Sequence, residues 1–433
     1  MHKISLLAAA GLLLVAPAAA SPLHERLSVA VAADTARNEA LLERLVNQNS
    51  GTLNLPGVRA VGELMRAELE PLGFRVRWVD MAHTERAGHL IARHPGKGRG
   101  KRVLLIGHLD TVFEPSSPFQ RYERKGERAV GPGVGDDKGG MVVIVAALRA
   151  MQAAGTLERA DVTVVLTGDE ERPGQPTDKA RVDLVEAAKQ ADAALEYENV
   201  AAEGGVEYAT VARRSGSAWE LRVTARTGHS SGVFGPSLGY GAIYEAARII
   251  DTFRRTLIEP NATFNVGLIA GGTPATIDAA GASVAASGKT NIVASTVVAR
   301  GDLRTLTPEQ DGKLRDAMAR IVADHLPGAT AKLEFYDSTP AMAPSEGNRA
   351  LLATLNAVNR DLGLPEMPEF DPAKRGAADS GFVAAYLPTL GGLGVAGGGA
   401  HGEGEWIDLK SIGRMALRSA ALITRLSQEK RRR

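Results

Sequence analysis

A histidine and an aspartate stand two positions apart, directly after a short run of apolar residues. The run covers residues 103–106, and Gly107, His108 and Asp110 follow it. An unbroken run of this length favours a strand buried on both faces of a parallel sheet, and such sheets carry functional groups at the C-terminal ends of their strands. A histidine there, with a carboxylate two residues on, suits a metal ligand oriented by its acidic neighbour. The alternative is a strand-end histidine that the aspartate simply caps.

Further carboxylates and another histidine stand at comparable positions, each after a predicted strand or within a glycine-rich turn. They are Asp136 in the turn 131–140, Glu170 and Glu171 after the apolar run 162–167, Glu198 after the run 193–195, and His401 after the glycines at 397–399. Taken singly, each could be a helix cap or a solvated loop residue. Because the C-terminal ends of parallel strands meet at one edge of a sheet, the set favours a shared site there.

The composition restricts the ligands and partners of such a site. The 433-residue chain has no cysteine, so a metal must bind through His, Asp and Glu. These ligands suit zinc, manganese or cobalt at a hydrolytic site. The net charge is +1 and no long basic run precedes the C-terminal residues 430–433, which argues against a nucleic-acid partner.

The first 20 residues have the pattern of a secretory signal peptide. Lys3 precedes an apolar stretch at 4–15, and alanines at 18–20 precede Ser21. The stretch is too short for a comfortable membrane span. We therefore expect an exported protein with no stable membrane span, located in the periplasm if the source is a Gram-negative bacterium.

Alternating strand and helix patterns predict an α/β fold with a doubly wound, mostly parallel sheet. Residues 212–324 change to a βαββα pattern, which predicts an inserted ferredoxin-like α+β domain. We expect a signal peptide at 1–20, a catalytic domain formed by 21–211 and 325–433, and the insert at 212–324. The last strand of the catalytic domain is expected at 391–396 and its final helix at 409–426.

In their order and spacing these motifs resemble those of the M20 metallopeptidases, most closely the glutamate carboxypeptidase branch. The resemblance rests on the segments 107–111, 131–139 and 167–171, on Tyr197-Glu198 and on His401, and it covers nearly the whole mature chain. The insert stands where that family has its lid, or dimerisation, domain. The resemblance implies a sheet of the zinc-peptidase type and a homodimer formed through the lid. It also implies hydrolysis of a C-terminal peptide bond or an N-acyl amino-acid amide bond in a small substrate.

The resemblance further implies two bound divalent metal ions, with zinc as the expected metal. Asp136 would bridge both ions. His108 and Glu198 would complete one site, and Glu171 and His401 the other. Two cations a few ångströms apart need a shared carboxylate, and together they lower the pKa of bound water towards about 7.

Two carboxylates have implied roles beside the ions. Asp110 would accept the second ring N–H of His108 and fix its tautomer. Glu170 would be the general base that takes a proton from the activated water and passes it to the leaving amine. The assignment of Glu170 as base and Glu171 as ligand follows from the resemblance and not from the spacing.

Three residues of the insert match further positions of the family. His229, in the segment 227–231, matches the histidine that reaches across a dimer to stabilise the tetrahedral oxyanion. Asn291 and Arg304 match an asparagine and an arginine that bind substrate, including its carboxylate, for which a bidentate arginine is well suited. The alternative is that Arg304 is a sheet-edge charge and Asn291 a turn residue.

Two segments depart from the glutamate-specific members of the branch. The segment 336–340 contains no arginine, and the family's Gly-Gly-Thr-Asp is replaced in 375–380 by Arg-Gly-Ala-Ala-Asp-Ser. Arg375 could supply a compensating charge. A preference for glutamate therefore does not follow from the sequence.

Two other functions are compatible with parts of the sequence. The segment 228–232 fits the G-x-S-x-G nucleophile elbow of serine hydrolases, with Ser230 as the nucleophile, although Gly235-Pro236 delays the helix that an elbow requires. The other alternative is an exported peptide-binding relative that keeps the fold without turnover. Such a protein would not need a complete set of ligands together with Glu170.

Overall fold

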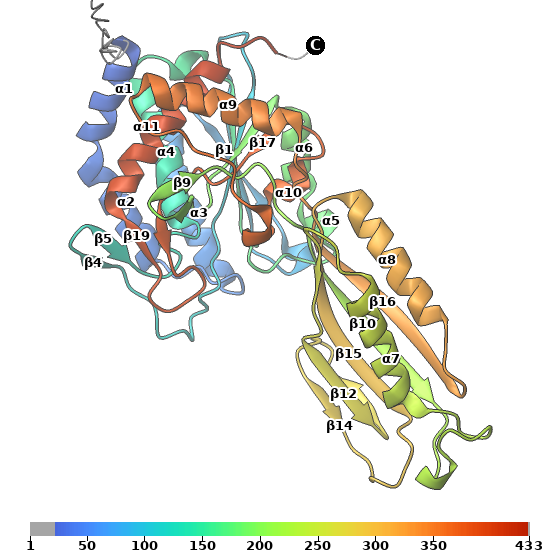
Figure 1. Cartoon of the computed structure of the whole chain (residues 1–433). Coiled ribbons are helices and arrows are strands. Elements are labelled where there is room, and N and C mark those ends of the chain that lie inside the picture. The colour runs from blue at the N-terminus through green and yellow to red at the C-terminus, as the bar shows by residue number, and fades with distance from the viewer. Residues whose placement is uncertain (1–21, 432–433) are drawn as a thin grey trace, which may run out of the picture.

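The computed structural model describes residues 22–431, so the predicted signal peptide at 1–20 lies outside the described residues. Figure 1 shows a larger α/β domain, formed by the N-terminal and C-terminal parts of the chain, and a smaller domain that projects from it. Among the helices of residues 22–431, none combines the length and the apolar character that crossing a bilayer requires.

The larger domain is built on a six-stranded sheet in the order β1-β2-β6-β3-β7-β17. Strands β6, β3, β7 and β17 are parallel, whereas β2 is antiparallel to β6 and β1 to β2. The prediction of a mostly parallel sheet is confirmed. The strands are β1 (Arg75–Asp80), β2 (Gly88–His94), β3 (Val103–His108), β6 (Val162–Thr167), β7 (Ala193–Glu196) and β17 (Thr389–Leu390).

The strand expected at 391–396 is wrong, because the last strand of this sheet ends at Leu390. The residues that follow make isolated bridges at Gly391 and Ala396. Leu393 and Val395 are buried there as loop residues. A short apolar run does not by itself distinguish a buried loop from a strand.

Helices cover both faces of the large sheet. Leu105 of β3 packs in one hydrophobic cluster with α4 and α11, while Leu104 and Ile106 pack in a second cluster with α6 and α10. All six residues of β3 are therefore buried, as its uninterrupted apolar run predicts. The helices of this domain are α1 (Pro22–Ala33), α2 (Thr35–Asn47), α3 (Leu55–Leu69), α4 (Lys138–Ala153), α5 (Thr177–Ala180), α6 (Val182–Lys189), α9 (Glu346–Asp361), α10 (Ser380–Val383) and α11 (Leu409–Leu426).

Short strands carry the glycine-rich segments of the larger domain. A four-stranded sheet consists of β4 (Glu123–Lys125), β5 (Arg128–Val130), β18 (Gly397–Gly398) and β19 (Trp406–Asp408). A separate hairpin is formed by β8 (Ala201–Glu203) and β9 (Val206–Tyr208). The larger domain also has the short 3-10 turns η1 (Glu70–Leu72), η2 (Ala82–Thr84), η3 (Leu157–Arg159) and η5 (Pro372–Lys374), and the smaller domain has η4 (Ser230–Gly232).

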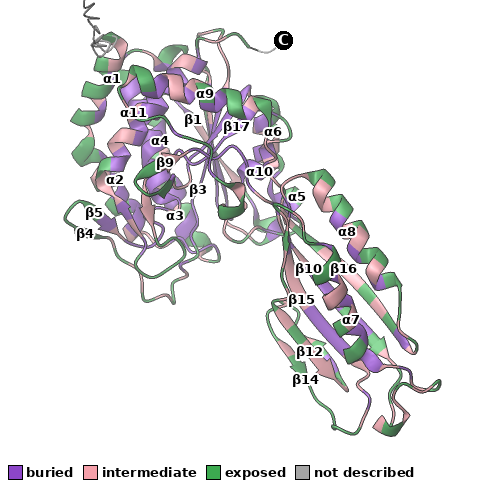
Figure 2. Cartoon of the chain, viewed as in Figure 1, coloured by how far each residue is buried: buried purple, intermediate pink, exposed green. Residues whose placement is uncertain are grey.

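The smaller domain is an antiparallel sheet with two helices, α7 (Gly241–Thr256) and α8 (Pro308–Ala323). Its strand order is β11-β15-β10-β16, with β12 also paired to β15. The strands are β10 (Gly216–Ala225), β11 (Thr263–Phe264), β12 (Leu268–Gly272), β15 (Thr296–Arg304) and β16 (Ala329–Thr339), and β13 (Ala275–Ile277) pairs with β14 (Val284–Ala286). Figure 2 shows that burial in this domain is concentrated along β10 and β15, beneath the helices.

The predicted end of the insert at residue 324 is wrong, because it leaves out β16. This strand pairs with β10 along its length, from Ala225↔Ala329 to Gly216↔Thr339. The insert therefore extends to about residue 339, and the second part of the larger domain begins after it. The two paired strands are more than 100 residues apart in the chain, so no local pattern indicates the pairing.

Candidate metal centre

Three neighbouring strands end at the same edge of the large sheet and present the predicted donors there. Strand β3 ends at His108, β6 is followed by Glu170 and Glu171, and β7 is followed by Glu198. Because β3 lies between β6 and β7 and all three are parallel, these side chains meet at the C-terminal ends of the strands. The turn before α4 adds Asp136.

The ring of His108 is held on both sides. Its Nδ1 lies 3.1 Å from the main-chain oxygen of Asp110 and 3.5 Å from Oδ1 of the same residue, and its Nε2 lies 3.0 Å from Oδ1 of Asp136. A proton on Nδ1 that is donated to Asp110 leaves the Nε2 lone pair for an ion. Burial lowers the pKa of His108, but the hydrogen bonds with Asp110 and Asp136 outweigh burial and raise that pKa well above its ordinary value.

The buried carboxylate of Asp110 also fixes the segment that follows β6. It accepts hydrogen bonds from the main-chain N–H of Glu170 (3.0 Å) and of Glu171 (3.2 Å), and from the hydroxyl of Thr52 (2.6 Å). One side chain therefore positions His108 and both glutamates. The sequence motifs do not identify Thr52, because a single threonine between two helices carries no local signal.

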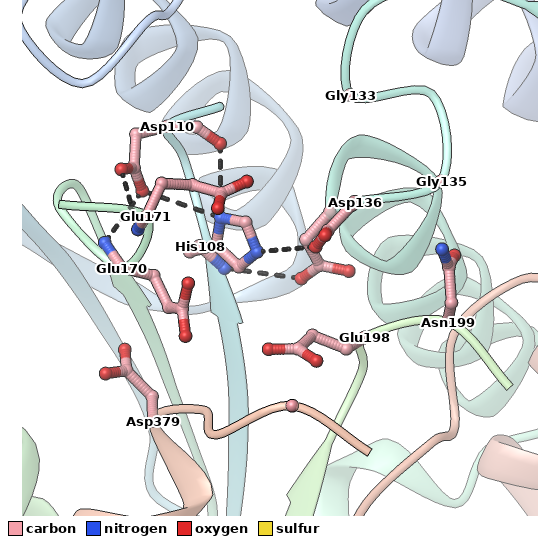
Figure 3. Close-up of polar contacts among 12 residues, drawn as sticks. His108, Asp110, Gly133, Gly135, Asp136, Glu170, Glu171, Glu198, Asn199 and Asp379 are labelled. Carbon is pink, nitrogen blue, oxygen red and sulfur yellow. Dashed lines mark hydrogen bonds and ion pairs between the residues drawn. The ribbon is translucent and has the colours of Figure 1, made fainter. Parts of the chain in front are cut away.

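The donor atoms form two groups, each of which could hold an ion. One group combines His108, Glu170 and Glu198, and the other combines His108, Asp136 and Glu171. Within each group the donor atoms lie within 4.8 Å of one another. Figure 3 shows the four carboxylates converging around the imidazole of His108.

His401 completes the second group. Its Nε2 lies 3.1 Å from Oδ2 of Asp136 and 3.1 Å from Oε2 of Glu171. It stands in the loop 399–405 between β18 and β19, with a φ of 65° and a side chain that is 57% exposed. The structure therefore brings the five predicted ligands together from segments that span almost 300 residues.

Burial, together with the charges of neighbouring carboxylates, raises the pKa of several carboxyl groups of the site. Burial is the largest cause for Glu170, whose pKa lies well above its ordinary value, and the charges of Glu198 and Asp379 add to it. Burial also raises the pKa of Glu198 to about 7, against the charge of Arg213. Within residues 22–431, the buried Oε1 of Glu171 has no hydrogen-bond partner. Such groups favour a bound cation, and a set of imidazole and carboxylate donors fits zinc.

Two arginines stand beside Glu198. Nη2 of Arg213 donates to Oε2 of Glu198 (2.7 Å) and to Oε2 of Glu196 (2.6 Å), and its Nη1 donates to the main-chain oxygen of Gly376 (3.1 Å). Arg213 thus connects the end of β7 to the segment that departs from the family pattern. In that segment Arg375 lies 3.8 Å from the same oxygen of Glu198, and burial lowers the pKa of Arg375 to about 10.

A buried ion-pair network supports the residue next to the predicted base. Arg181 is 1% exposed and donates from Nη1 to Asp169 (2.6 Å) and from Nε to Asp379 (2.7 Å). The hydroxyl of Thr167 donates to the second oxygen of Asp379 (2.5 Å). The network fixes the start of the segment that carries Glu170.

The three predicted residues of the smaller domain are divided between its two ends. His229 and Asn291 lie together beyond the end of β10 that is distant from the larger domain, where the N–H of Ser230 donates to the main-chain oxygen of Asn291 (2.8 Å). Arg304 lies at the opposite end, where β15 pairs with the start of β10, and it contacts Asp302 at 3.1 Å. At about 3.3 Å per residue, β10 separates these two places by roughly 30 Å.

The serine-hydrolase alternative lacks its structural context. Ser230 begins the three-residue turn η4, and the next helix, α7, begins at Gly241. A nucleophile elbow requires a strand that turns directly into a helix. Nδ1 of His229 lies 2.9 Å from the hydroxyl of Ser231, which is not the serine at the centre of the motif.

Comparison with known proteins identifies the family to which this chain belongs. The sequence model of peptidase family M20/M25/M40 matches residues 104–425. The chain belongs to this family. It is similar to carboxypeptidase G2 of Pseudomonas sp. (strain RS-16), with 28% identity over 399 residues that make up 90% of this chain and 89% of that protein. Membership identifies the chain as an enzyme of the metallopeptidase and amidohydrolase class.

Solved structures confirm the α/β fold at lower sequence identity. A tripeptidase from Staphylococcus aureus has a TM-score of 0.71 at 20% identity, covering 91% of this chain and 99% of that chain. A dinuclear metal-binding peptidase of family M20 from Bacillus subtilis has a TM-score of 0.64 at 14% identity, covering 91% of this chain and 98% of that chain.

Proposed function

We propose that this M20 enzyme is an exported di-zinc hydrolase that cleaves a C-terminal peptide bond or an N-acyl amino-acid amide bond. The observation that carries the proposal is the position of Asp136, whose two carboxylate oxygens contact His108 (3.0 Å) and His401 (3.1 Å). Glu198 lies in a donor group with His108, and Glu171 in one with Asp136. This is the arrangement that two neighbouring cations require, because one carboxylate must lie between them. The name of the relative carboxypeptidase G2 supports cleavage at a C-terminal residue.

In the proposed centre Asp136 would be shared by the two ions. His108 and Glu198 would hold one ion, and Glu171 and His401 would hold the other. The absence of cysteine and the imidazole and carboxylate donors suit zinc. When bound, zinc supplies Lewis acidity that polarises the scissile carbonyl and lowers the pKa of water.

Glu170 is the proposed general base. Its donor atom lies within 4.8 Å of those of His108 and Glu198, so it can reach a water molecule held among them. It takes a proton from the attacking water and delivers it to the leaving amine. Asp110 supports this role because it accepts the main-chain N–H of Glu170 and also orients the ring of His108.

His229 is proposed to act on the metal centre of a second chain. It lies beyond the distant end of β10, roughly 30 Å from the start of that strand. A homodimer formed through the smaller domains would bring the histidine of one chain to the centre of the other. Its Nδ1 accepts the N–H of Ser231 at 3.2 Å, which leaves the proton on Nε2 for donation to an oxyanion.

Arg304 and Asn291 are the proposed substrate-binding residues, and Asn291, which lies beside the His229 segment, would act with His229 on the substrate of the second chain. Arg304 is partly exposed at the end of the smaller domain nearest the larger one, where its guanidinium can pair with a substrate carboxylate. The proposed substrate is a small peptide or an N-acyl amino acid with a free carboxylate. No preference for glutamate is proposed, because 336–340 lacks arginine.

The test compares N-acyl amino acids and dipeptides with their carboxamide counterparts, in the presence of zinc and of a chelator. We expect hydrolysis of the free acids, loss of activity with chelator and recovery with zinc. Arg304→Gln should raise KM for the acids by about 10- to 100-fold, because a hydrogen-bonded charge is lost, with little effect on the carboxamides. Arg254→Gln, on the exposed face of α7, is the matched control.

Three outcomes would overturn the proposal. Activity that survives chelation and is lost in Ser230→Ala would indicate a serine hydrolase. Tight substrate binding without turnover in the zinc-loaded protein would indicate a binding relative. Equal hydrolysis of acids and carboxamides would contradict recognition of the carboxylate. Fractionation of cells that express the full chain tests export, which predicts a mature protein that begins at Ser21.

A further inference from the structure

Glu405 joins two loops of the metal centre through a single buried side chain. The residue is 1% exposed. Its carboxylate accepts three main-chain N–H groups: Oε2 accepts from Gly133 (2.9 Å), and Oε1 accepts from Gly135 (2.7 Å) and Asp136 (2.9 Å). Its main-chain oxygen also accepts the N–H of Gly131 (3.1 Å). Every one of these bonds is made to the turn that leads to Asp136.

The glycines of that turn allow the main chain to approach the carboxylate. Gly133 has a φ of +67°, which L side chains rarely adopt, and a Cβ at Gly135 would lie 2.8 Å from Oδ1 of Asn199 and 3.2 Å from Oε1 of Glu405. Successive main-chain N–H groups in such a turn form a concave site for an anion. Figure 3 shows Gly133 and Gly135 in the turn that ends at Asp136. The carboxylate of Glu405 accepts three N–H groups of this turn, so the turn takes its anion from within the chain.

Glu405 also anchors the loop that carries the last predicted ligand. It is the final residue before β19 and lies four positions after His401. The loop 399–405 is rich in glycine, and the side chain of His401 is 57% exposed, so packing alone does not position that ring. The loop is held at its two ends by the hairpin pair Gly398↔Trp406 and by the bonds of Glu405 to the turn, while within it His401 contacts Asp136 and Glu171.

We propose that Glu405 is a positioning residue that holds the turn 133–136 and the loop 399–404 at the separation at which Asp136 and His401 bind one ion. The inference rests on the metal centre proposed above. Removal of the carboxylate would leave three N–H groups of the turn without this acceptor and would leave the base of the His401 loop joined to the turn only through the main-chain oxygen of residue 405. Loss of partners that orient metal ligands typically weakens metal affinity by about 10- to 100-fold.

The test is a graded pair of substitutions with a control from the same loop. In Glu405→Gln one oxygen can still accept from Gly135 and Asp136, but an NH2 group then faces the N–H of Gly133. Glu405→Ala removes all three acceptors. Glu403→Gln is the control, because Glu403 is exposed two residues earlier.

The readout is zinc affinity from competition with a chromogenic chelator, together with hydrogen exchange of residues 131–137 in the zinc-free protein. We expect affinity to fall by about 10-fold in Glu405→Gln and about 100-fold in Glu405→Ala, with faster exchange in the turn and no change in Glu403→Gln. Excess zinc should restore most of the kcat of Glu405→Gln, which a purely structural defect would not allow.

Zinc affinity and turn exchange that stay at wild-type values in Glu405→Gln would overturn the inference, even if the melting temperature falls. If Glu405→Ala does not fold, the zinc affinity of Glu405→Gln and the hydrogen exchange of its turn still test the positioning role of Glu405. Failure of the proposed function is seen separately, as wild-type activity that is insensitive to chelator.

Discussion

The predicted residues of the larger domain are held in place, whereas those of the smaller domain are not. His108 is 2% exposed and bonded on both ring nitrogens to aspartates. His229 is exposed, and its Nδ1 contacts the hydroxyl and the main-chain N–H of Ser231, two residues away. The difference teaches that the predicted metal ligands are preorganised within one chain, while the proposed oxyanion and substrate contacts would depend on where the smaller domain of the same or another chain is placed.

The two domains also have separate hydrophobic cores. The larger domain packs one cluster on each face of its sheet, around α4 on one side and α6 on the other. The smaller domain has its own cluster, in which the fully buried Trp219 packs against Phe253. Because the cores are separate, the effect of a substitution in one domain on the other domain can be measured.

The largest effect is expected in the preorganised centre. Glu170→Ala should lower kcat by about 10²- to 10⁴-fold, because general-base catalysis is lost, while the protein keeps its zinc. Steady-state kinetics measure the fall in kcat, and metal analysis of the same preparation measures the zinc content. Glu158→Ala, at an exposed surface ion pair, is the control. A variant with near-wild-type kcat would remove Glu170 from its proposed role, and loss of zinc would indicate that it is a ligand.

A second and smaller effect is expected in the smaller domain. His229→Ala should lower kcat by about 10²- to 10³-fold through loss of an oxyanion donor, with unchanged zinc content. If the histidine acts across a dimer, co-expression with Glu170→Ala should restore part of the activity, because one site of the mixed dimer has both groups. Mixed dimers as inactive as their parents would show that His229 serves its own chain or has no catalytic role.

The smallest effect concerns acid stability of the smaller domain. Burial raises the pKa of Glu245, but hydrogen bonds from Arg248 and from the N–H of Leu326 outweigh burial and lower that pKa below its ordinary value of 4.5. A carboxyl with a depressed folded pKa stabilises fully above its unfolded pKa, and this stabilisation is lost as the pH falls through the folded value. Glu245→Gln should therefore cost about 1–3 kcal/mol at pH 7 and weaken the loss of stability below pH 4.5.

Hydrogen exchange of β10 and β15 at several pH values measures this change, and zinc content reports on the larger domain. Asp316→Asn, at an exposed position of α8, is the control. We expect the metal centre of Glu245→Gln to remain loaded. Simultaneous loss of zinc would show that the two domains do not respond separately.

The proposed metal donors could be predicted from the sequence because most of them stand at or shortly after the end of a strand, and Asp136 stands in a glycine-rich turn. His108 ends β3, and Glu171 and Glu198 follow β6 and β7 closely. Apolar runs of strand length and glycine-rich turns are local signals, and parallel strands that are neighbours present their ends at one edge. The family resemblance then supplied the division of roles between Glu170 and Glu171, which spacing does not contain.

The sequence by itself determined the chemistry of this protein: imidazole and carboxylate donors without thiols, placed at strand ends. Only the tertiary structure decided which distant side chains support them, such as Arg213 on Glu198 and Glu405 on the turn of Asp136. It also placed β16 in the smaller domain and separated His229 from Arg304 by the length of β10. The physical reason is that periodicity and turn preferences act over a few residues, whereas strand pairing and buried hydrogen bonds join segments far apart in the chain.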